Sequence, residues 1–547
     1  MDKDKYNEKM HHILSDTIKF NEVGPPQFSL IFKTEDKINR TLKQLKDDSF
    51  ISEDTYRSLY STGSSFGILY GLPKVHKDNV PLRPILAAYN SPSFSIAKFL
   101  VPLLKSLSVN QYTLHNSSQF VPEILQQNPD CYMVSYDVCS LFTNVPLAET
   151  IDIILNFLFP NPTSLFNGFN VNSFRKLLEL AVMDTHFIFN NKVFRQIDGM
   201  AMGSPLGPTF ANIFMCHLED LYINQCPSDF KPVFYRRYVD DTFLLFKEKH
   251  HANLFLDFVN SFHRNIQFTM EQETDNRLSF LDILVYREDN QFLTGIFRKK
   301  TFSGLGLNFF SHCPFSFKLN SCKTLLSRAF ALTSNWIKFH EEIMFLKSYF
   351  NKNCYPSFLF DKIVNNFLEC IFKPRTPIYD VPKKQMYVSL PYSHNSVHIK
   401  RKLTRFLGNL YPYVNFHFIF KNPLTIGSLF KFKDTLPELM RSSTVYLYSC
   451  PKCNSGKYIG NSSRLLKVRI NCHMGVSHRT GSSLNKKEFS AIRNHAISCK
   501  HHIQYADFKI IAQSEKNYSL PLLESLYIKH LSPNLNCSTT SVPLHIG

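Results

Sequence analysis

Two adjacent aspartates, Asp240 and Asp241, lie between two apolar runs in the stretch KPVFYRRYVDDTFLLF, residues 231–246. The runs predict two strands joined by a tight turn. A plain hairpin would favour Asn-Gly or Asp-Gly there, because the turn requires positive φ. Two acidic residues at this point indicate a chemical role; the alternative interpretation is a solvated acidic turn.

A third carboxylate, Asp137, ends another predicted strand in CYMVSYDVCSLFTNVP, residues 131–146. If this strand neighbours the hairpin, three carboxylates converge at one sheet edge, which is costly unless divalent cations neutralise them. Carboxylate oxygens bind hard cations such as Mg²⁺ or Mn²⁺ and leave positions open for phosphate. Two such ions held about 4 Å apart can activate a 3′-hydroxyl and stabilise a leaving pyrophosphate.

Two loops carry groups that suit a nucleotide. GLPKVHKDNVPLRPI places Lys74, Lys77 and Arg83 in a loop suited to a triphosphate, unless it is only a basic surface loop. QIDGMAMGSPLGP, residues 196–208, has three glycines between a strand pattern and a helix pattern. Glycines permit close approach of the backbone to a ligand, although an ordinary Gly-rich turn is the alternative.

A second group of reactive side chains lies near the C-terminus, in STVYLYSCPKCNSGKYIGNSSRLLKVRINCH. This stretch predicts two short strands and a helix that carry, in order, Tyr446, Tyr458, Arg469 and His473. A phenol can relay a proton and a guanidinium can hold a phosphate through two hydrogen bonds. The set therefore suits phosphodiester cleavage, whereas packed tyrosines and a solvated arginine are the alternatives.

The cysteine pattern suggests one metal site. Cys450 and Cys453 form the chain's Cys-x-x-Cys pair, and NHAISCKHH, residues 494–502, could supply two more ligands. Two cysteines and a spaced histidine pair suit tetrahedral structural Zn²⁺; unliganded thiols and surface imidazoles are the alternative.

Composition bounds the class of protein. A chain of 547 residues is too long for one core, and 44 % hydrophobic content with 51 Phe allows large ones, so we expect three or four domains. The net charge is +18, and residues 441–547 hold 14 Lys+Arg against 4 Asp+Glu, which favours a nucleic-acid partner over a merely solvated basic surface.

Targeting signals are weak. The N-terminal stretch lacks the apolar core of a secretory signal, and the long uncharged runs are interrupted by Asn, Pro and Gly, so we expect no membrane contact. Scattered cysteines indicate an intracellular chain, and HIKRKLTR, residues 398–405, is the nearest approach to a nuclear signal, so we expect a nuclear location.

The order of helix and strand patterns along the chain predicts a multidomain α/β (α+β) protein. The expected units are a helical N-terminal region (1–60), an alternating α/β region (61–300), a helical region (301–372), a Pro- and charge-rich connector (373–440) and a small α/β module (441–547).

The ordered motifs LPKVHK…PLRPI, YDVCSLFTNVP, QIDGMAMGSPLGP, YVDD and LSFLDILV resemble the motif series of reverse transcriptases, most closely those of Penelope-like retroelements. The resemblance covers residues 66–328. It implies a right-hand polymerase with fingers and palm in 61–300 and a helical thumb in 301–372.

The same resemblance implies individual roles. Asp137, Asp240 and Asp241 would hold the catalytic metal ions, and Arg83 with Lys74 would hold the incoming triphosphate. Phe142 would lie under the sugar and clash with a 2′-hydroxyl, which favours deoxynucleotides; a core Phe is the alternative. The template and nucleotide pocket would be lined by Gln196, Gly203, Ser204 and Pro205.

The C-terminal stretch resembles the GIY-YIG nucleases fused to Penelope-like reverse transcriptases, with VYL and YIG as the two motif halves. The resemblance implies catalytic Tyr446 and Tyr458, a phosphate-stabilising Arg469, an assisting His473 and a divalent ion on Glu524. Thr444 in place of the first glycine and Asn461 in place of a frequent Glu are departures. The zinc ligands that the resemblance implies are Cys450, Cys453, His495 and His501. Cys499 and His502 are alternative candidates for the last two positions.

Together these patterns predict an RNA-directed DNA polymerase coupled to a DNA-nicking endonuclease for target-primed reverse transcription. Its partners would be an RNA template, a DNA target or primer, and deoxynucleoside triphosphates. Two alternatives stay open: a telomere-associated reverse transcriptase that uses existing DNA ends, and an inactive, co-opted nucleic-acid-binding relic.

Overall fold

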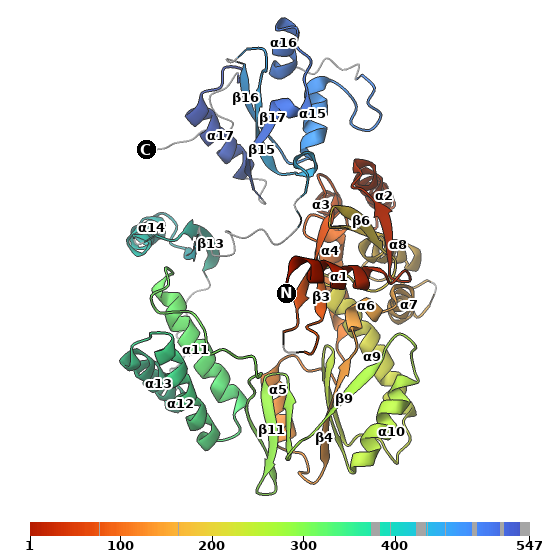
Figure 1. Cartoon of the computed structure of the whole chain (residues 1–547), viewed down its shortest axis with the longest axis vertical. Coiled ribbons are helices and arrows are strands. Elements are labelled where there is room, and N and C mark those ends of the chain that lie inside the picture. Colours follow the sequence, from red (N-terminus) through yellow and green to blue (C-terminus); the bar gives the residue numbers. More distant parts are fainter. Residues whose placement is uncertain are drawn as a thin grey trace.

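The computed structural model describes these residues: 1–75, 77–161, 163–373, 383–393, 395–422, 434, 436–453, 456–483, 490–514 and 519–536. They form a large α/β body, a bundle of three helices, a small β-α-β unit and a C-terminal α/β unit (Figure 1). The mixed α/β organisation predicted from the sequence is confirmed.

The first sheet of the body has five strands in the order β1-β6-β5-β2-β3, and only the β2–β5 pair is parallel. Its strands are β1 (Phe20–Gly24), β2 (Gly67–Pro73), β3 (Leu82–Ala87), β5 (Thr185–Phe189) and β6 (Lys192–Gln196). The preceding and following helices are α1 (Lys3–Leu14), α2 (Phe28–Asp47), α3 (Glu53–Leu59), α4 (Phe94–Leu104), the 3₁₀ turn η1 (Lys105–Ser108) and α5 (Ser117–Ile124). Residues 1–60 are mainly helical, as predicted, but they also contribute the strand β1, which the sequence did not reveal.

The second sheet has the order β7-β8-β4-β9 and is antiparallel throughout. Its strands are β4 (Tyr132–Val138), β7 (Phe234–Tyr238), β8 (Asp241–Phe246) and β9 (Phe268–Gln272). The helices of this part are α6 (Leu141–Asn144), α7 (Leu147–Leu158), α8 (Val171–Val182), α9 (Gly207–Gln225) and α10 (Lys249–Asn260).

Strand β4 is buried on both faces because its period-two pattern carries apolar residues on each side. Val134 and Tyr136 belong to the main core under the helices, whereas Met133 belongs to a second core on the other face. A one-residue shift of register would exchange the two faces, so packing fixes where the strand ends and therefore where Asp137 lies.

The second core joins the sheet to the next strands and to the helical bundle. It packs against the antiparallel ribbon β10 (Arg277–Phe280), β11 (Ile283–Glu288) and β12 (Gln291–Ile296). The bundle consists of α11 (Phe315–Leu332), α12 (Trp336–Lys352) and α13 (Ser357–Phe372). The predicted helices of this region are confirmed.

The segment expected to be a connector contains a folded β-α-β unit. It consists of β13 (Lys384–Pro391), α14 (Ser396–Leu410) and β14 (Val414–Lys421), and its two strands are parallel. Residues 374–382 of that predicted connector lie outside the described residues.

The C-terminal unit is a three-stranded antiparallel sheet in the order β16-β15-β17 with helices on its faces. Its elements are η3 (Glu438–Met440), β15 (Thr444–Ser449), β16 (Lys457–Ser462), α15 (Leu466–Met474), α16 (Ala491–Ser498), η4 (Tyr505–Asp507), β17 (Phe508–Gln513) and α17 (Ser519–Leu531). The two strands and the helix predicted for residues 443–473 are confirmed.

This unit touches the N-terminal helix α2. Arg479 forms an ion pair with Asp36, and the rings of His478 and Phe32 lie 5.2 Å apart in an edge-to-face arrangement. Met440 is buried in one core cluster with residues of the first sheet. The N-terminal residues thus form a contact surface for the C-terminal unit.

In the part of the chain that the structure describes, no helix combines the length and the apolarity that a membrane crossing requires.

The glycine-rich loop between β6 and α9 lies directly on strand β3. The Leu86 backbone N–H donates to the Met202 carbonyl over 2.7 Å. Gly203 has φ of +126°, and a Cβ atom added there would lie 2.0 Å from the Leu86 carbonyl oxygen. The close approach predicted for this loop is therefore an approach to a neighbouring strand, which fixes the loop against the first sheet.

We predict that Gly203→Ala lowers the thermal midpoint more than Gly168→Ala does. Both glycines have positive φ, so both alanines cost roughly 1 kcal/mol in backbone strain, or about 2–4 °C. Only Gly203 adds a backbone clash, since no atom lies within 4 Å of a Cβ at Gly168. Thermal melts of the two variants check this, and equal shifts would contradict it.

Candidate active sites

Three carboxylates meet where strand β4 ends beside the β7–β8 hairpin. Asp137 on β4 is the direct cross-strand partner of Asp241, the first residue of β8. Asp240 occupies the turn, and its carbonyl accepts a hydrogen bond from the Val138 N–H over 3.2 Å. The structure thus brings together the carboxylates that sequence spacing predicted to converge.

The hairpin turn has an unfavourable backbone conformation at Val239. Its φ is +57°, in a region that β-branched residues rarely adopt and that costs of the order of 1–3 kcal/mol. Positive φ in this turn therefore falls on the residue before the paired aspartates, and surrounding contacts must hold it there.

The electrostatics of the carboxylates favour bound cations. Burial and the neighbouring Asp240 charge raise the pKa of Asp137. Burial, Asp240 and Asp137 together raise the pKa of Asp241 to about 6. Their negative charges are therefore poorly compensated by the protein, and oxygen ligands of this kind suit Mg²⁺ or Mn²⁺.

The turn between β2 and β3 brings positive charge to the same edge. Lys77 Nζ lies 3.7 Å from Asp137 Oδ2, an exposed ion pair that the sequence did not reveal. Burial, with the charges of Arg83 and Lys77, lowers the pKa of Lys74, and Asp137 and Asp240 act in the opposite sense. The predicted phosphate-binding residues Lys74 and Arg83 thus lie in a cationic cluster that faces the carboxylates.

The remaining predicted pocket residues lie around the glycine-rich loop. Phe142 is half-buried at the edge of the main core, and its carbonyl accepts from the Met200 N–H over 2.7 Å. Gln196 is buried, and its amide donates to the Asp198 and Gly199 carbonyls. Gln196 thus shapes the loop from within.

Ser204 and Pro205, in the same loop, are partly exposed. The Ser204 N–H donates to the Ala201 carbonyl over 3.0 Å, and the Ser204 carbonyl accepts from the Gly207 N–H. The loop therefore turns directly into helix α9, with Gly203 at its exposed bend.

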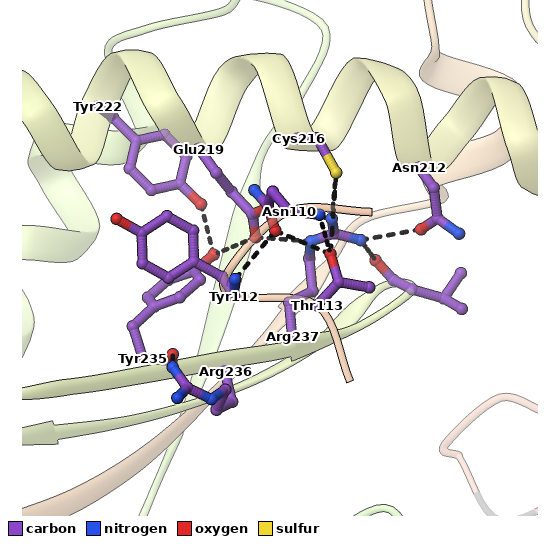
Figure 2. Close-up of polar contacts among 11 residues, drawn as sticks. Asn110, Tyr112, Thr113, Asn212, Cys216, Glu219, Tyr222, Tyr235, Arg236 and Arg237 are labelled. Atoms are coloured by element: carbon purple, nitrogen blue, oxygen red, sulfur yellow. Dashed lines mark hydrogen bonds and ion pairs between the residues drawn. The ribbon is translucent and has the colours of Figure 1, made fainter. Parts of the chain in front are cut away.

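A buried ion pair lies beneath the aspartate hairpin, and sequence reasoning missed it. Arg237 on β7 and Glu219 on α9 are both fully buried and share two hydrogen bonds, of 2.6 and 3.1 Å (Figure 2). Arg237 adds bonds to the Asn212 side chain, the Cys216 thiol and the Val239 carbonyl. All five guanidinium donors are therefore used.

Glu219 is equally saturated. Its two oxygens also accept from the Tyr235 hydroxyl and the Asn110 amide, over 2.9 and 2.8 Å (Figure 2). The Arg237 backbone N–H and carbonyl bond to Tyr112 and Leu114, respectively. A buried charge pair is tolerated only when its polar atoms are satisfied in this way.

The bond from Arg237 to the Val239 carbonyl makes this network part of the site. It links the strained turn residue to helix α9, whose first turn follows the glycine-rich loop. The adjacent arginines in FYRRYVDD were the available signal, because a charged residue inside an apolar strand must find a buried partner.

A second candidate site lies in the C-terminal unit. The Tyr446 hydroxyl is 2.8 Å from His473 Nε2 and accepts a bond from Arg469 Nε over 3.0 Å. Burial raises the pKa of Tyr446, and burial with the Arg469 charge lowers the pKa of His473 to about 3. At neutral pH a neutral imidazole and a phenol therefore share a hydrogen bond, next to a guanidinium.

The other predicted members of this site lie on neighbouring elements. The Tyr458 and His473 rings have centroids 5.8 Å apart. A Cβ at Gly460 would lie 2.5 Å from the Tyr446 hydroxyl, so the glycine leaves room for that group. Glu524 on α17 is buried and accepts from the Asn461 amide over 2.6 Å. A carboxylate near this cluster could hold one divalent cation.

The structure alters the predicted zinc set at one position. Cys450, Cys453, His495 and Cys499 place their ligand atoms within 4.8 Å of one another. His501 is absent from this group, because its Nε2 bonds to the Asp507 carboxylate over 2.9 Å. The rival Cys499 takes its place.

Distances within this group fit a metal. Cys453 Sγ lies 3.2 Å from His495 Nε2, and Cys499 Sγ lies 3.5 Å from the same atom. Ligand atoms around tetrahedral Zn²⁺ are roughly 3.3–3.8 Å apart for metal–ligand lengths of about 2.0–2.3 Å. Three thiolates and an imidazole could hold the ion at the end of α16.

The first site lies in a segment that matches a protein family. Residues 75–279 match the model of the family described as reverse transcriptase (RNA-dependent DNA polymerase), and this segment is a reverse transcriptase domain. It contains all three carboxylates and the Arg237–Glu219 pair. Residues 305–365 match the animal helix-turn-helix domain, which corresponds to α11, α12 and part of α13.

Solved structures show distant similarity. The apo telomerase of Candida tropicalis, truncated from its C-terminal domain, is 12% identical at a TM-score of 0.34, over 42% of this chain and 55% of that chain. The telomerase of Candida albicans with a TWJ fragment of telomeric RNA is 10% identical at 0.40, over 55% and 59%. The Sicinivirus 3Dpol RNA-dependent RNA polymerase is 11% identical at 0.38, over 59% and 71%.

The aligned region thus spans less than two thirds of either telomerase chain. Among curated protein sequences, none is similar enough to be counted as a match.

We predict that Arg237→Lys slows nucleotide addition to a primed RNA template at least tenfold. Lysine has three donors in place of five, so the Val239 carbonyl and Asn212 lose their fixed partner. The measurement is kcat and KM for the nucleotide, with the loss expected mainly in kcat.

Arg287→Lys is the matched control. Arg287 pairs with Glu273 and donates to the Cys131 carbonyl, beside the end of β4 opposite Asp137. Both variants should lower the thermal midpoint by a few degrees, since both weaken a partly or fully buried pair. Equal losses of nucleotide addition would show that Arg237 acts only through overall stability.

We also expect Cys499→Ser to abolish bound zinc and His501→Ala to retain it. Metal analysis of the purified full chain should give one zinc per wild-type molecule. If the His501→Ala variant lost its zinc and the Cys499→Ser variant kept it, the ligand set first predicted from the sequence would be the correct one.

Proposed function

We propose that this protein is an RNA-directed DNA polymerase. The observation that carries the proposal is the convergence of Asp137, Asp240 and Asp241 at one sheet edge within a reverse transcriptase domain. Divalent ions bound there would activate the primer 3′-hydroxyl and stabilise the leaving pyrophosphate.

The chain's own side chains would position the reactants. Lys74 and Arg83 would bind the triphosphate of the incoming nucleotide, opposite the carboxylates. Phe142, half-buried beside the glycine-rich loop, would exclude a 2′-hydroxyl. The Arg237–Glu219 pair would keep the aspartate hairpin in place while divalent ions bind to the carboxylates and leave them.

A second activity, DNA nicking by the C-terminal unit, is favoured by a separate observation. Tyr446 on β15 forms a connected hydrogen-bond chain with His473 and Arg469 on α15, in a unit whose motifs resemble GIY-YIG nucleases. In this role Tyr446 and His473 would pass a proton from the attacking water, while Arg469 would brace the phosphate. Tyr458 would orient the water or metal, and Glu524 would hold that ion.

With both activities, the protein would perform target-primed reverse transcription as a Penelope-like retroelement enzyme, in the nucleus. The nick would expose the 3′-hydroxyl that the polymerase extends. Two alternatives remain: a telomere-associated reverse transcriptase would use existing ends and need no nicking, and an inactive nucleic-acid-binding relic would do neither.

We predict that Asp240→Ala abolishes deoxynucleotide addition to a primed RNA template while plasmid nicking is retained. Conversely, Arg469→Ala should reduce nicking at least a hundredfold and leave primer extension unchanged. The two sites use separate residues, so each variant serves as the control for the other. Primer extension and supercoiled-plasmid relaxation, both in Mg²⁺, measure the two activities.

The outcomes separate the alternatives. Extension without nicking by the wild type would favour the telomere-associated enzyme. Absence of both from folded, RNA-binding protein would favour the relic. Equal loss of both activities in either folded variant would contradict the two-site account.

A further inference from the structure

The β-α-β unit at residues 383–422 carries positive charge without any acidic residue. It contains no Asp or Glu, and its seven cations are Lys383, Lys384, Lys400, Arg401, Lys402, Arg405 and Lys421. All seven are exposed, and none forms an ion pair with the residues that the structure describes. The unit is a concentrated cationic surface without internal compensation.

Helix α14 covers only one face of the two-stranded sheet. Val388 and Phe418 are register partners, as are Leu390 and Phe420, and these residues are partly or fully buried. Because successive strand residues point to opposite faces, their neighbours lie on the outer face. Parallel strands are normally covered on both faces, but among the residues that the structure describes no second layer covers this outer face.

The outer face presents aromatic rings to solvent. Tyr387 and His417 are register partners whose rings stack with centroids 4.9 Å apart and planes 22° apart. Tyr387 is 66% exposed, and Ile419 next along the face is 43% exposed. Lys421 lies on the same face at the end of β14. Flat rings, an apolar surface and a cation are thus arranged along one strand pair.

The unit is attached to the start of the helical bundle. The Asn422 amide donates to the His312 carbonyl over 2.7 Å, and the Tyr392 and His312 rings lie 4.9 Å apart. His312 precedes α11, so the unit lies next to the beginning of that helix (Figure 1). A ligand bound to this unit would be held beside the helical bundle that follows the reverse transcriptase domain.

We propose that the outer face of β13 and β14 binds single-stranded RNA. Unpaired bases stack on exposed aromatic rings without regard to sequence, and a lysine on the same face, here Lys421, can neutralise a phosphate. A duplex hides its base faces, so Tyr387 and His417 would have nothing to stack on. The preference for RNA over single-stranded DNA rests on the proposed function, which requires an RNA template.

The competing occupant is an acidic protein surface. Such a partner would match the charge but would not require two stacked, exposed rings. The face is also narrow, because only β13 and β14 form it, and a single-stranded nucleic acid needs little width. These features favour the nucleic acid, and a competition experiment decides between the two.

The test uses the full chain, a fluorescein-labelled oligouridine of 20 nucleotides and EDTA, so that neither activity can operate. Anisotropy over a salt series gives the affinity and its salt dependence. Tyr387→Ala with His417→Ala should weaken binding about tenfold with the salt slope unchanged, because stacking is lost and charge is kept.

Neutralising the outer-face cation with K421Q should flatten the slope, because Lys421 lies on the same face as the two rings. The expected change is about 0.7 in log K per log salt for one lost phosphate contact. The matched control is K33Q, which removes one exposed cation elsewhere and should leave the slope nearly unchanged.

Photo-crosslinking with 4-thiouridine locates the site directly. Peptides from residues 383–422 should be labelled, also in the Asp240→Ala variant, so the result does not depend on polymerase activity. Unchanged affinity of the Tyr387 and His417 double variant, or absence of labelling in this segment, would overturn the proposal. Preferential competition by duplex DNA or by polyglutamate would overturn it too, and equal binding of single-stranded DNA would remove the RNA preference.

Discussion

The mutual repulsion of three carboxylates at one sheet edge is the constraint on which the rest of the structure depends. Asp137 and Asp241 are direct cross-strand partners, and Asp240 follows a turn residue with positive φ. Like charges this close destabilise the folded protein without bound cations, as the raised pKa of Asp241 indicates. The surrounding protein must therefore hold the aspartates together against their own electrostatics. Packing of β4 into two cores fixes one of them, and the buried network beneath the hairpin fixes the others.

That network connects the metal side of the site to the nucleotide side. Glu219 and Asn212 lie on α9, the helix that begins at the glycine-rich loop, and both bond to Arg237. The loop in turn lies on β3, which carries the phosphate-binding candidate Arg83. One continuous set of contacts thus joins hairpin, helix, loop and strand. A buried ion pair contributes little net stability compared with apolar packing, so its value here lies in fixing geometry.

Local patterns were enough to predict the ends of strands and the convergence of reactive side chains. The alternation before Asp137 and the apolar runs around Asp240 both became strands. Contacts across long sequence distances were not predictable: Arg237 pairs with a glutamate 18 residues away on another element. The fourth zinc ligand was predicted wrongly, because spacing alone did not show that His495 and Cys499, four residues apart at the end of α16, face the same way. The sequence predicts a connector in place of the β-α-β unit because the Pro- and charge-rich stretch 373–385 leads into it, although its two strands are eight residues long.

The reverse transcriptase domain carries the three carboxylates, and helix α2 contacts the C-terminal unit. We expect the three carboxylates to bind divalent ions. Calorimetric titration of the full chain with Mn²⁺ in the presence of a non-hydrolysable deoxynucleotide, wild type beside the Asp137→Asn variant, tests this most directly. The account predicts two more ions per molecule for the wild type than for the variant, or a loss of affinity of at least a hundredfold. Identical stoichiometry and affinity in a folded variant would contradict it.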